Sequence, residues 1–592
     1  MPTRDLVLGL VGSGGDGVIT MGEMITQAGA REGLHVIKVE SYGPQIRGGE
    51  SACTVRLSAD RIHTEGDLLD VLVAFNWADF RRFGTEMVAA PDAVVFYEAL
   101  DSDAINEAAV GTKDRSRWIA VPFSQIARES TGGTLGKNIV ALGVVSQLFG
   151  LPQEPIRRAV RVKFTAKKAE VLASNLRGFE AGVTFAKSVN QDVSDKRISY
   201  EPGDPRLVMS GNEAAAVGAL HAGCRFFAGY PITPSSEILH FLSEWMPRFG
   251  GSVIQTEDEL AAIGAVIGAS FAGAKAMTAT SGPGLALMTE MLGLASQAEV
   301  PVVILDVQRV GPSTGIPTKS EQSDLFQALW GTHGDAPRVV IAPADVDDCF
   351  HATVAAFNIA ERFQIPVIVL SDQYIAQRRV SLPMLRTDHE VEARLVPGQD
   401  ELQDYKRYSD TPSGVSPMSF PGVVGGEYQT NGLEHNEYGR PTSMHLVHEH
   451  MNQKRYRKLL TVRDHYSFVR HHGSEDAEVG ILCWGSSKGA VKDAVLRANA
   501  RGEKVAAFVP QVLYPFPRHE FESFARNVKE FVVIELSYSA QFYKYLRTFL
   551  DLPESHTYVH KRSGAKNLTV KEVEDTINGV LKIASMRHRV LV

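Results

Sequence analysis

The stretch that decides the fold is residues 300–308, "VPVVILDVQ". It is apolar at both odd and even positions, which is typical of a strand in a parallel sheet with helices on both faces. Similar segments, separated by helical patterns, are 252–256 "SVIQT", 276–280 "AMTAT", 338–342 "RVVIA" and 365–371 "IPVIVLS". We therefore predict a doubly wound parallel sheet over residues 205 to about 380.

Two further regions show the same α/β pattern. Residues 1–190 begin with a strand, a glycine loop, a helix and the strand "HVIKVE" at 35–40. Residues 471–592 contain "VGILCWG", "KVAAFVP" and "FVVIEL" as strand candidates. Residues 191–204 are polar and predict a linker, and 381–470 predict a long irregular connection ending in a charged helix. The chain is thus expected to form several three-layer α/β domains.

The composition excludes several classes of protein. The chain of 592 residues has 44% hydrophobic and 22% charged residues and a net charge of −8, which is typical of a globular protein that does not bind nucleic acid. The apolar runs 6–11 and 261–274 are too short for a signal peptide core and for a membrane span. We expect a soluble cytoplasmic protein without a membrane segment.

The cysteines argue against a metal cluster on this chain. Cys53, Cys224, Cys349 and Cys483 are each more than a hundred residues apart. Local metal and iron–sulfur motifs need cysteines a few residues apart. Any redox metal is therefore expected on another chain.

A glycine loop follows the first strand. Gly12, Gly14 and Gly17 match G-x-G-x-x-G, and Glu40 closes the next strand, as in dinucleotide-binding sites. A glycine-rich turn without a ligand is the alternative. The segment 41–51, "SYGPQIRGGES", offers a second loop in which Arg47 suits a phosphate.

The segment 230–237, "YPITPSSE", predicts a turn between a strand and a helix. Thr233 suits the N-cap and Pro234 the first helical position. Free N–H groups at such an end attract anions. The alternative is a capped helix with no ligand.

Three more features could belong to a site. Glu257, Asp258 and Glu259 open a helix, so they either compensate its dipole or include one carboxylate that meets a cofactor nitrogen. The loop 280–284, "TSGPG", opens another helix and could hold a ligand. Arg309 follows the strand 300–308, where it suits a carboxylate or forms a salt bridge at the rim.

Together these segments resemble a known family. "YPITPSSE", "EDELAAIGAVIGAS", "TSGPG" and "QRVGPSTGIPTKSEQSDL" resemble the α subunit of 2-oxoacid:ferredoxin oxidoreductases, and the N-terminal region resembles that family's γ subunit, fused here to α. The resemblance covers nearly the whole chain and is weakest over 381–470. It makes 1–190 a γ-like domain, 205–380 a pyrimidine-binding α domain and 471–592 a transketolase-C-like domain.

The resemblance implies a thiamine diphosphate enzyme that decarboxylates a 2-oxoacid, transfers the acyl group to coenzyme A and reduces ferredoxin. A fused γα chain is most similar to the 2-oxoglutarate enzyme. The family's diphosphate motif, Gly-Asp-Gly followed by Asn, is incomplete here, because 38–50 contain no Asn after Gly15-Asp16-Gly17. The resemblance therefore implies a β subunit with the Mg²⁺ and diphosphate site and a [4Fe-4S] cluster, in a dimer of heterodimers.

The resemblance also implies roles for residues. It places Glu259 at the pyrimidine N1′, Arg309 and Thr233 at the oxoacid, and Thr318 with Lys319 near the far end of the substrate. Ile232 and Ser281 would line the pyrimidine side of the thiamine site. Coenzyme A would contact the glycine loop and the following loop, through Gly12, Gly14, Gly15, Gly17 and Arg47.

Three alternatives stay open on the sequence alone. The oxoacid could be pyruvate or a branched-chain acid, because pocket residues around Thr318 and on the β subunit decide selectivity. The G-x-G-x-x-G loop could serve an NAD-dependent dehydrogenase. The chain could also be a non-catalytic scaffold subunit.

Overall fold

The computed structural model describes residues 2–43, 49–104, 110–112 and 114–590, and it divides the chain into two compact units. The N-terminal unit contains residues 1–210 and 377–385. The second unit contains residues 211–376 and 386–592. The chain thus leaves the first unit after residue 210 and returns to it for one short segment.

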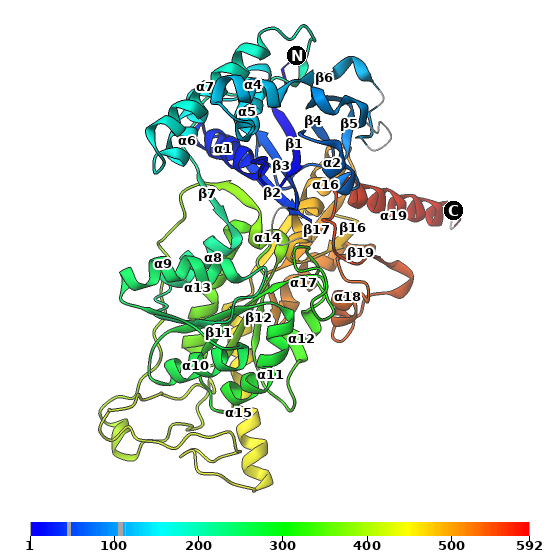
Figure 1. The fold of residues 1–592 in the computed structure, drawn as a ribbon. Coiled ribbons are helices and arrows are strands. Elements are labelled where there is room, and N and C mark those ends of the chain that lie inside the picture. The colour runs from blue at the N-terminus through cyan, green and yellow to red at the C-terminus, as the bar shows by residue number, and fades with distance from the viewer. Residues whose placement is uncertain (1, 44–48, 105–109, 113, 591–592) are drawn as a thin grey trace. The chain divides into compact units, whose positions relative to one another are not determined.

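The N-terminal unit is built on an eight-stranded sheet with the order β6-β5-β4-β1-β3-β2-β14-β7 (Figure 1). Its strands are β1 (Asp5–Ser13), β2 (His35–Tyr42), β3 (Glu50–Ser58), β4 (Leu69–Ala74), β5 (Ala89–Glu98), β6 (Trp118–Val121), β7 (Leu207–Ser210) and β14 (Arg379–Leu382). Its helices are α1 (Val18–Arg31), α2 (Trp77–Phe83), α4 (Phe123–Thr131), α5 (Lys137–Phe149), α6 (Gln153–Phe164) and α7 (Ala169–Ala186).

The sequence of β1 explains the two layers around this sheet. Leu8 and Leu10 belong to the core formed with α1, α5 and α7, whereas Val7 and Val11 belong to the core that contains Trp77 of α2. Alternate residues of a strand point to opposite faces, so a fully apolar β1 needs cover on both sides. The sheet therefore has helices on each face.

The position of β3 corrects the expected dinucleotide-binding arrangement. β3 lies between β1 and β2 and pairs antiparallel with both, so β1 and β2 are not neighbours. The Nζ of Lys38 lies 2.6 Å from Oε1 of Glu40, which pairs the acid expected at a ribose with a cation of its own strand. The NAD-type reading of this loop is therefore wrong in its geometry.

Two short strands lie at the ends of the range expected for the second domain. β7 and β14 pair antiparallel with each other, and β14 also pairs with β2. The hydroxyl of Ser381 in β14 accepts a hydrogen bond from Val36 N at 2.8 Å and donates one to Leu34 O at 3.0 Å. The segment 191–204, expected as a linker, is also fastened to this unit, since Gly203 N donates to Glu32 O.

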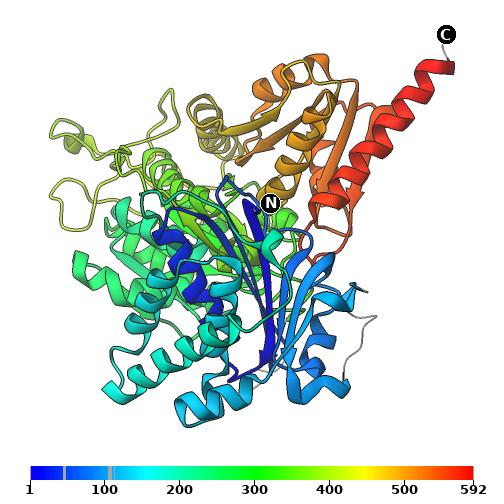
Figure 2. The same cartoon turned by 90° about the horizontal axis from the view of Figure 1, so that it is seen from above.

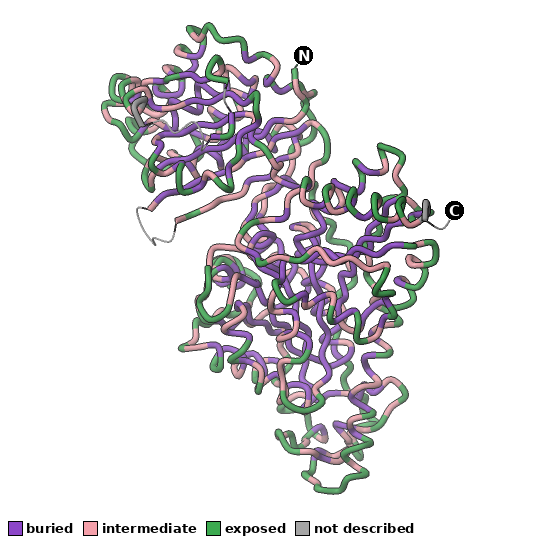
Figure 3. The backbone as a smooth tube through the Cα atoms, turned by 90° about the vertical axis from the view of Figure 1, so that its right-hand side faces the viewer, coloured by how far each residue is buried: buried purple, intermediate pink, exposed green. Residues whose placement is uncertain are grey.

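The second unit contains the predicted parallel sheet, with the order β18-β12-β13-β11-β10-β8-β9. All residues of β11 (Val302–Gln308) are buried, as its apolar sequence predicts. Helices α10 and α11 pack on one face, and α13 covers the other, with α8 beside it. Figure 3 shows buried residues concentrated in the interior of the unit, with exposed residues mainly at its surface.

A smaller sheet with the order β15-β17-β16-β19-β20 forms the C-terminal domain. The predicted strands "VGILCWG", "KVAAFVP" and "FVVIEL" are its three central strands. The chain from this domain also adds β18 to the edge of the seven-stranded sheet, antiparallel to β12. The long helix α19, red in Figure 2, carries the chain to its C-terminus.

The strands of the second unit are β8 (Phe226–Gly229), β9 (Ser252–Gln255), β10 (Ala276–Thr280), β11 (Val302–Gln308), β12 (Val339–Ile341), β13 (Pro366–Asp372), β15 (Val469–Gly473), β16 (Val479–Leu482), β17 (Val505–Pro510), β18 (Val512–Tyr514), β19 (Glu530–Glu535) and β20 (Thr557–Lys561). Its helices are α8 (Gly211–His221), α9 (Ser236–Trp245), α10 (Glu259–Phe271), α11 (Gly282–Gln297), α12 (Leu325–Trp330), α13 (Val346–Phe363), α14 (Gln373–Gln377), α15 (His445–His465), α16 (Lys488–Ala500), α17 (Arg518–Phe524), α18 (Gln541–Leu546) and α19 (Val570–Val590).

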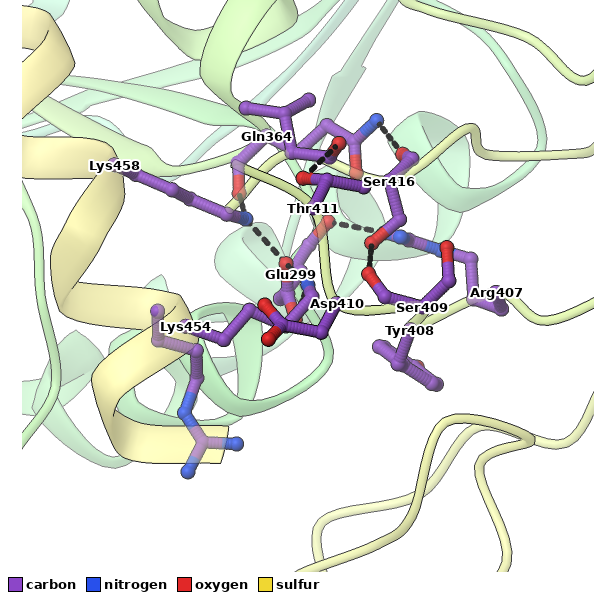
Figure 4. Close-up of polar contacts among 12 residues, drawn as sticks. Glu299, Gln364, Arg407, Tyr408, Ser409, Asp410, Thr411, Ser416, Lys454 and Lys458 are labelled. Atoms are coloured by element: carbon purple, nitrogen blue, oxygen red, sulfur yellow. Dashed lines mark hydrogen bonds and ion pairs between the residues drawn. The ribbon is translucent and has the colours of Figure 1, made fainter. Parts of the chain in front are cut away.

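The long connection 386–444 and helix α15 are attached to the sheet domain through Glu299 (Figure 4). This carboxylate is 1% exposed and accepts hydrogen bonds from Lys454 Nζ at 2.7 and 2.8 Å, and it also pairs with Lys458. Arg407, in the connection, donates from Nη2 to the backbone oxygen of Glu299 at 2.7 Å. One acid therefore holds two separate segments against the end of α11.

We predict that Glu299→Ala strongly destabilises the protein. Removing one partner of a buried ion pair leaves an uncompensated charge and costs about 3–5 kcal/mol, and here two lysines lose their partner. The shift of the denaturant midpoint measures this cost. The control is Glu290→Ala, an exposed acid on helix α11, which ends just before Glu299; this substitution should change the midpoint little. Equal shifts for both variants would contradict the assigned role.

Candidate active site

Four loops meet at the carboxyl edge of the seven-stranded sheet. They follow β8, β9, β10 and β11, which are mutually parallel in the order β11-β10-β8-β9. The carboxyl ends of parallel strands are where ligands bind in such sheets. The loops carry the predicted residues Thr233, Glu259, Ser281 and Arg309.

Arg309 lies directly after β11 and is only 7% exposed. Its Nη1 donates a hydrogen bond to the backbone oxygen of Thr233 at 2.6 Å. Its Nε has no hydrogen-bond partner among the described residues. Burial lowers the pKa of Arg309, and the carboxylates of Asp324 and Glu259 oppose this shift. The structure thus brings Arg309 and Thr233 together and leaves part of a charged guanidinium available.

The turn at 230–235 differs from the prediction in its helix boundary. Helix α9 begins at Ser236 and its N-cap is Ser235, so Thr233 is not the N-cap residue. Ser235 N and Ser236 N both donate to Ile232 O, which closes the turn ahead of the helix. The Asn212 side chain also donates to Pro234 O at 2.9 Å. The turn therefore fixes Thr233 with an exposed side chain and with its carbonyl directed to Arg309.

The acids that open α10 divide into different roles. Asp258 is the N-cap, since its Oδ1 accepts a hydrogen bond from Ala261 N at 2.8 Å, and Glu257 is exposed. Glu259 is the first residue of the helix and is 5% exposed. Helix capping therefore explains why an acid is present at Asp258, but it does not explain the buried carboxylate of Glu259.

The loop 280–284 is filled by protein groups. Ser281 is the N-cap residue of α11, and its hydroxyl is buried without a hydrogen-bond partner among the described residues. A Cβ atom on Gly284 would lie 2.0 Å from Thr280 Oγ1 and 2.6 Å from Glu259 Oε1. A Cβ atom on Gly282 would lie 2.6 Å from Asp324 Oδ2. The glycines are thus required because two carboxylates lie against the first turn of α11.

Two acids of this site were not predicted from the sequence. Asp306 lies inside β11, fully buried, and neither carboxylate oxygen has a hydrogen-bond partner in the described structure. Burial and the charge of Asp324 raise the pKa of Asp306 well above its usual range. Burial, with the charge of Glu321, raises the pKa of Asp324 to about 7, while Arg309 opposes this shift. The signal that could have found Asp306 is an acid inside the apolar run 300–308.

Thr318 and Lys319 lie on the loop that follows Arg309, and both are partly exposed. The loop folds back on itself, since Val310 N donates to Lys319 O at 3.0 Å and Ile316 N donates to Val310 O. The structure therefore holds the backbone of Lys319 next to the residue that follows Arg309.

Two glycines of the loop in the N-terminal unit lie against side chains of that unit. A Cβ atom on Gly12 would lie 2.9 Å from Asp16 Oδ2, and one on Gly17 would lie 2.4 Å from Asn138 Nδ2. Gly14 N donates to Gly49 O, and only open space surrounds the Cβ position of Gly15. Arg47 lies outside the described residues. The loop therefore needs glycine at 12 and 17 for its own packing.

Three family models match successive parts of the chain. Residues 7–185 match the model of pyruvate ferredoxin/flavodoxin oxidoreductase. Residues 217–454 match the thiamine diphosphate-binding domain of pyruvate flavodoxin/ferredoxin oxidoreductase. Residues 477–573 match core domain II of pyruvate:ferredoxin oxidoreductase. The 2-oxoglutarate oxidoreductase subunit KorA of Mycobacterium tuberculosis is 32% identical over 560 residues, covering 89% of this chain and 84% of the relative. The chain belongs to the 2-oxoacid:ferredoxin oxidoreductase family.

Other members of this family match equally long or more similar regions. The 2-oxoglutarate synthase subunit KorA of Methanothermobacter marburgensis is 38% identical over 356 residues, covering 58% of this chain and 92% of the relative. The 2-oxoglutarate:ferredoxin oxidoreductase from Magnetococcus marinus, solved with 2-oxoglutarate, coenzyme A and succinyl-CoA bound, matches with a TM-score of 0.91 and 36% identity. That match covers 98% of this chain and all of the other. The family assignment confirms the predicted multidomain α/β fold.

The described part of the chain contains no group of three or more His, Cys, Asp or Glu residues that could hold a metal ion. All four cysteines are free and buried. Among the described helices, none combines the length and the apolar character needed to cross a membrane.

We predict that Gly284→Ala disturbs the site and the fold. The added methyl group meets Thr280 and Glu259, and overpacking of this kind costs about 1–3 kcal/mol. The matched control is Gly293→Ala in the same helix, where the nearest atom lies 3.9 Å away. That substitution should be neutral or should stabilise by up to about 1 kcal/mol. Thermal unfolding of both variants measures the difference, and a neutral Gly284→Ala would show that the close approach is absent.

Proposed function

We propose that this chain is the γα subunit of a 2-oxoglutarate:ferredoxin oxidoreductase. The reaction converts 2-oxoglutarate, coenzyme A and oxidised ferredoxin into succinyl-CoA, CO₂ and reduced ferredoxin, and it is reversible. The observation that carries the proposal is the carboxyl edge of the central sheet, where a buried guanidinium and the buried carboxylate of Glu259 come together. The full-length similarity to the Magnetococcus marinus enzyme supports this choice of substrate.

The site suits thiamine diphosphate. Glu259 offers a buried carboxylate to the aminopyrimidine N1′, and the unpartnered hydroxyl of Ser281 and the backbone at Ile232 would line the same side. Thiamine diphosphate, when bound, supplies the carbon nucleophile for the keto group and accepts the electron pair released with CO₂. Glu259 would hold a proton at N1′ through a hydrogen bond with its buried carboxylate.

Arg309 would bind and orient the oxoacid. Its Nη1 is occupied by Thr233 O, so the rest of its planar fork can pair with the carboxylate next to the keto group. The hydrogen bond to a carbonyl fixes the guanidinium plane before the substrate arrives. Thr233, Thr318 and Lys319 would complete the oxoacid pocket.

A partner subunit completes the enzyme in this proposal. The relatives are named as subunits, and the β subunit would carry the diphosphate and Mg²⁺ site and the [4Fe-4S] cluster that reduces ferredoxin. The buried, separate cysteines of this chain support that division. The exposed apolar side chains of Ile254, Leu260 and Leu287, on β9, α10 and α11, offer a surface for the partner beside Glu259. Two such heterodimers would form the assembly, and coenzyme A would bind through the N-terminal unit.

The proposal is tested by producing the chain with its β subunit and assaying 2-oxoglutarate-dependent reduction of ferredoxin. Glu259→Gln should lower turnover by about a hundredfold or more, since it removes a proton-holding group. The control Glu257→Gln changes an exposed acid two residues earlier, and it should keep full activity. Both variants should assemble with the β subunit. An active Glu259→Gln complex would remove Glu259 from the mechanism.

Heat protection of the chain by NAD, rather than by coenzyme A, would favour a dehydrogenase instead.

Selectivity for 2-oxoglutarate is predicted to involve Thr318. Its hydroxyl would pair with the distal carboxylate, which pyruvate lacks, and an unpaired polar group costs about 1–3 kcal/mol. Thr318→Ala should therefore lower kcat/KM for 2-oxoglutarate about tenfold while changing that for pyruvate little. Measuring kcat/KM for both acids decides this. An unchanged ratio would show that another group, on this chain or on the β subunit, reads the distal carboxylate.

A further inference from the structure

Three acids surround the first turn of α11. Asp324 lies against Gly282, and Glu259 lies against Gly284. Asp306 is paired in register with Thr280, the last residue of β10 before this turn. Glu259 has a role in the proposed reaction, whereas Asp306 and Asp324 have none. Their place at the site therefore needs its own explanation.

The backbone of Asp324 is anchored by a hydrogen bond, whereas one oxygen of its carboxyl group has no hydrogen-bond partner in the described structure. Asp324 N donates to Gln308 Oε1 at 3.1 Å, and Gln308 Nε2 donates to Ser371 O at 3.0 Å. This chain of bonds anchors Asp324 to the residue that precedes Arg309. Its Oδ2 is enclosed and has no hydrogen-bond partner in the described structure, although the residue as a whole is partly exposed. Because no donor stabilises a charge on this enclosed oxygen, the neutral form of the carboxyl group is favoured.

The charged groups around Asp324 and Arg309 come from three elements. Asp306 and Arg309 lie on and after β11, Glu259 opens α10, and Glu321 belongs to the same loop as Asp324. Glu321 is satisfied by Gly564 N at 2.8 Å and by the Ser323 hydroxyl at 3.0 Å. Arg309 is thus the cation that faces the acids, and its charge attracts an anionic substrate only to the extent that the acids do not neutralise it.

We propose that Asp324 is a positioning residue that sets the net charge offered by Arg309 to the oxoacid. This rests on the proposed function. Protonated Asp324 leaves the guanidinium uncompensated, so the substrate carboxylate binds well. Ionised Asp324 competes for the same guanidinium and weakens substrate binding. At an effective dielectric constant of about 20, a unit charge about 4 Å away changes binding by roughly a thousandfold, and one about 12 Å away still changes it by roughly tenfold. Ionisation of Asp324 should therefore weaken substrate binding by at least about tenfold.

The first test compares KM and kcat between about pH 6 and pH 8.5 in the complex with the β subunit. In the wild type, KM for 2-oxoglutarate should rise as Asp324 ionises, by at least about tenfold. Asp324→Asn is the permanently neutral form, so its KM should stay at the wild-type value of low pH across the range, with kcat changed less than twofold. Glu257→Gln is the control and should keep the wild-type profile.

The second test uses no substrate and separates this inference from the proposed function. Asp324 has a raised pKa in the folded protein, whereas an unfolded aspartate ionises near about 3.9. Folded protein therefore holds more protons than unfolded protein between these values, and its stability falls as pH rises through this window. The gain in unfolding temperature of Asp324→Asn over the wild type should grow from about pH 5 to about pH 7 and then stay constant.

The unfolding temperature and the KM profile of Asp324→Asn together decide the inference. A growing gain in unfolding temperature with a flat KM profile in Asp324→Asn supports the inference. A gain that does not depend on pH would show that Asp324 does not titrate here, and a variant KM profile parallel to the wild type would remove its effect on Arg309. Either result overturns the inference. If the wild-type complex used no 2-oxoacid while the pH-dependent gain persisted, the proposed function and the role toward substrate would fail, and Asp324 would be a titrating acid only.

Discussion

The second unit is organised around one constraint, the burial of charge at the carboxyl end of β11. The strand itself is fully buried and almost entirely apolar, yet it contains Asp306 and leads into Arg309. A guanidinium in such surroundings needs acceptors, and Thr233 O from the loop after β8 supplies one. The position of that turn, and of the acids at the first turn of α11, follows from this need. The chemistry of the site therefore depends on how the sheet balances these charges.

Buried charge also organises the structure at the opposite end of α11. Glu299 is a single buried acid that holds Lys454 and Lys458 of α15 and, through its backbone oxygen, Arg407 of the long connection. The connection has little regular structure, so its backbone contributes few repeated hydrogen bonds to its own stability. Its order comes from individual polar anchors, such as the bidentate pair of Arg394 with Glu361. Irregular segments of this length are normally costly in conformational entropy, and buried charges here offset that cost.

Sequence reasoning found the strands of the central sheet because their composition is decided by burial. "VPVVILDVQ" and "IPVIVLS" are β11 and β13, and Arg309 was placed at the strand end where the structure has it. It failed where partners are distant in sequence. The sequence near residue 50 contains no signal that β3 separates β1 from β2. The start of helix α9 at Ser236 likewise depends on a turn closed by Ile232 O. The place of Asp324 in the site could not be predicted for the same reason, because its carboxyl group lies against Gly282, forty-two residues earlier in the chain.

The pairing of β14 bears on how such a fused chain can arise. β14 follows the parallel strands β8 to β13 in the chain, yet it lies between β2 and β7, and Ser381 hydrogen-bonds to the backbone of residues 34 and 36. A break in the polypeptide near residue 205 would leave this strand pairing in place. Separate genes for the two parts could therefore still yield products that recognise each other by strand complementation. Covalent fusion raises the effective concentration of the two parts for each other, and the pairing of β14 with β2 already favours their association.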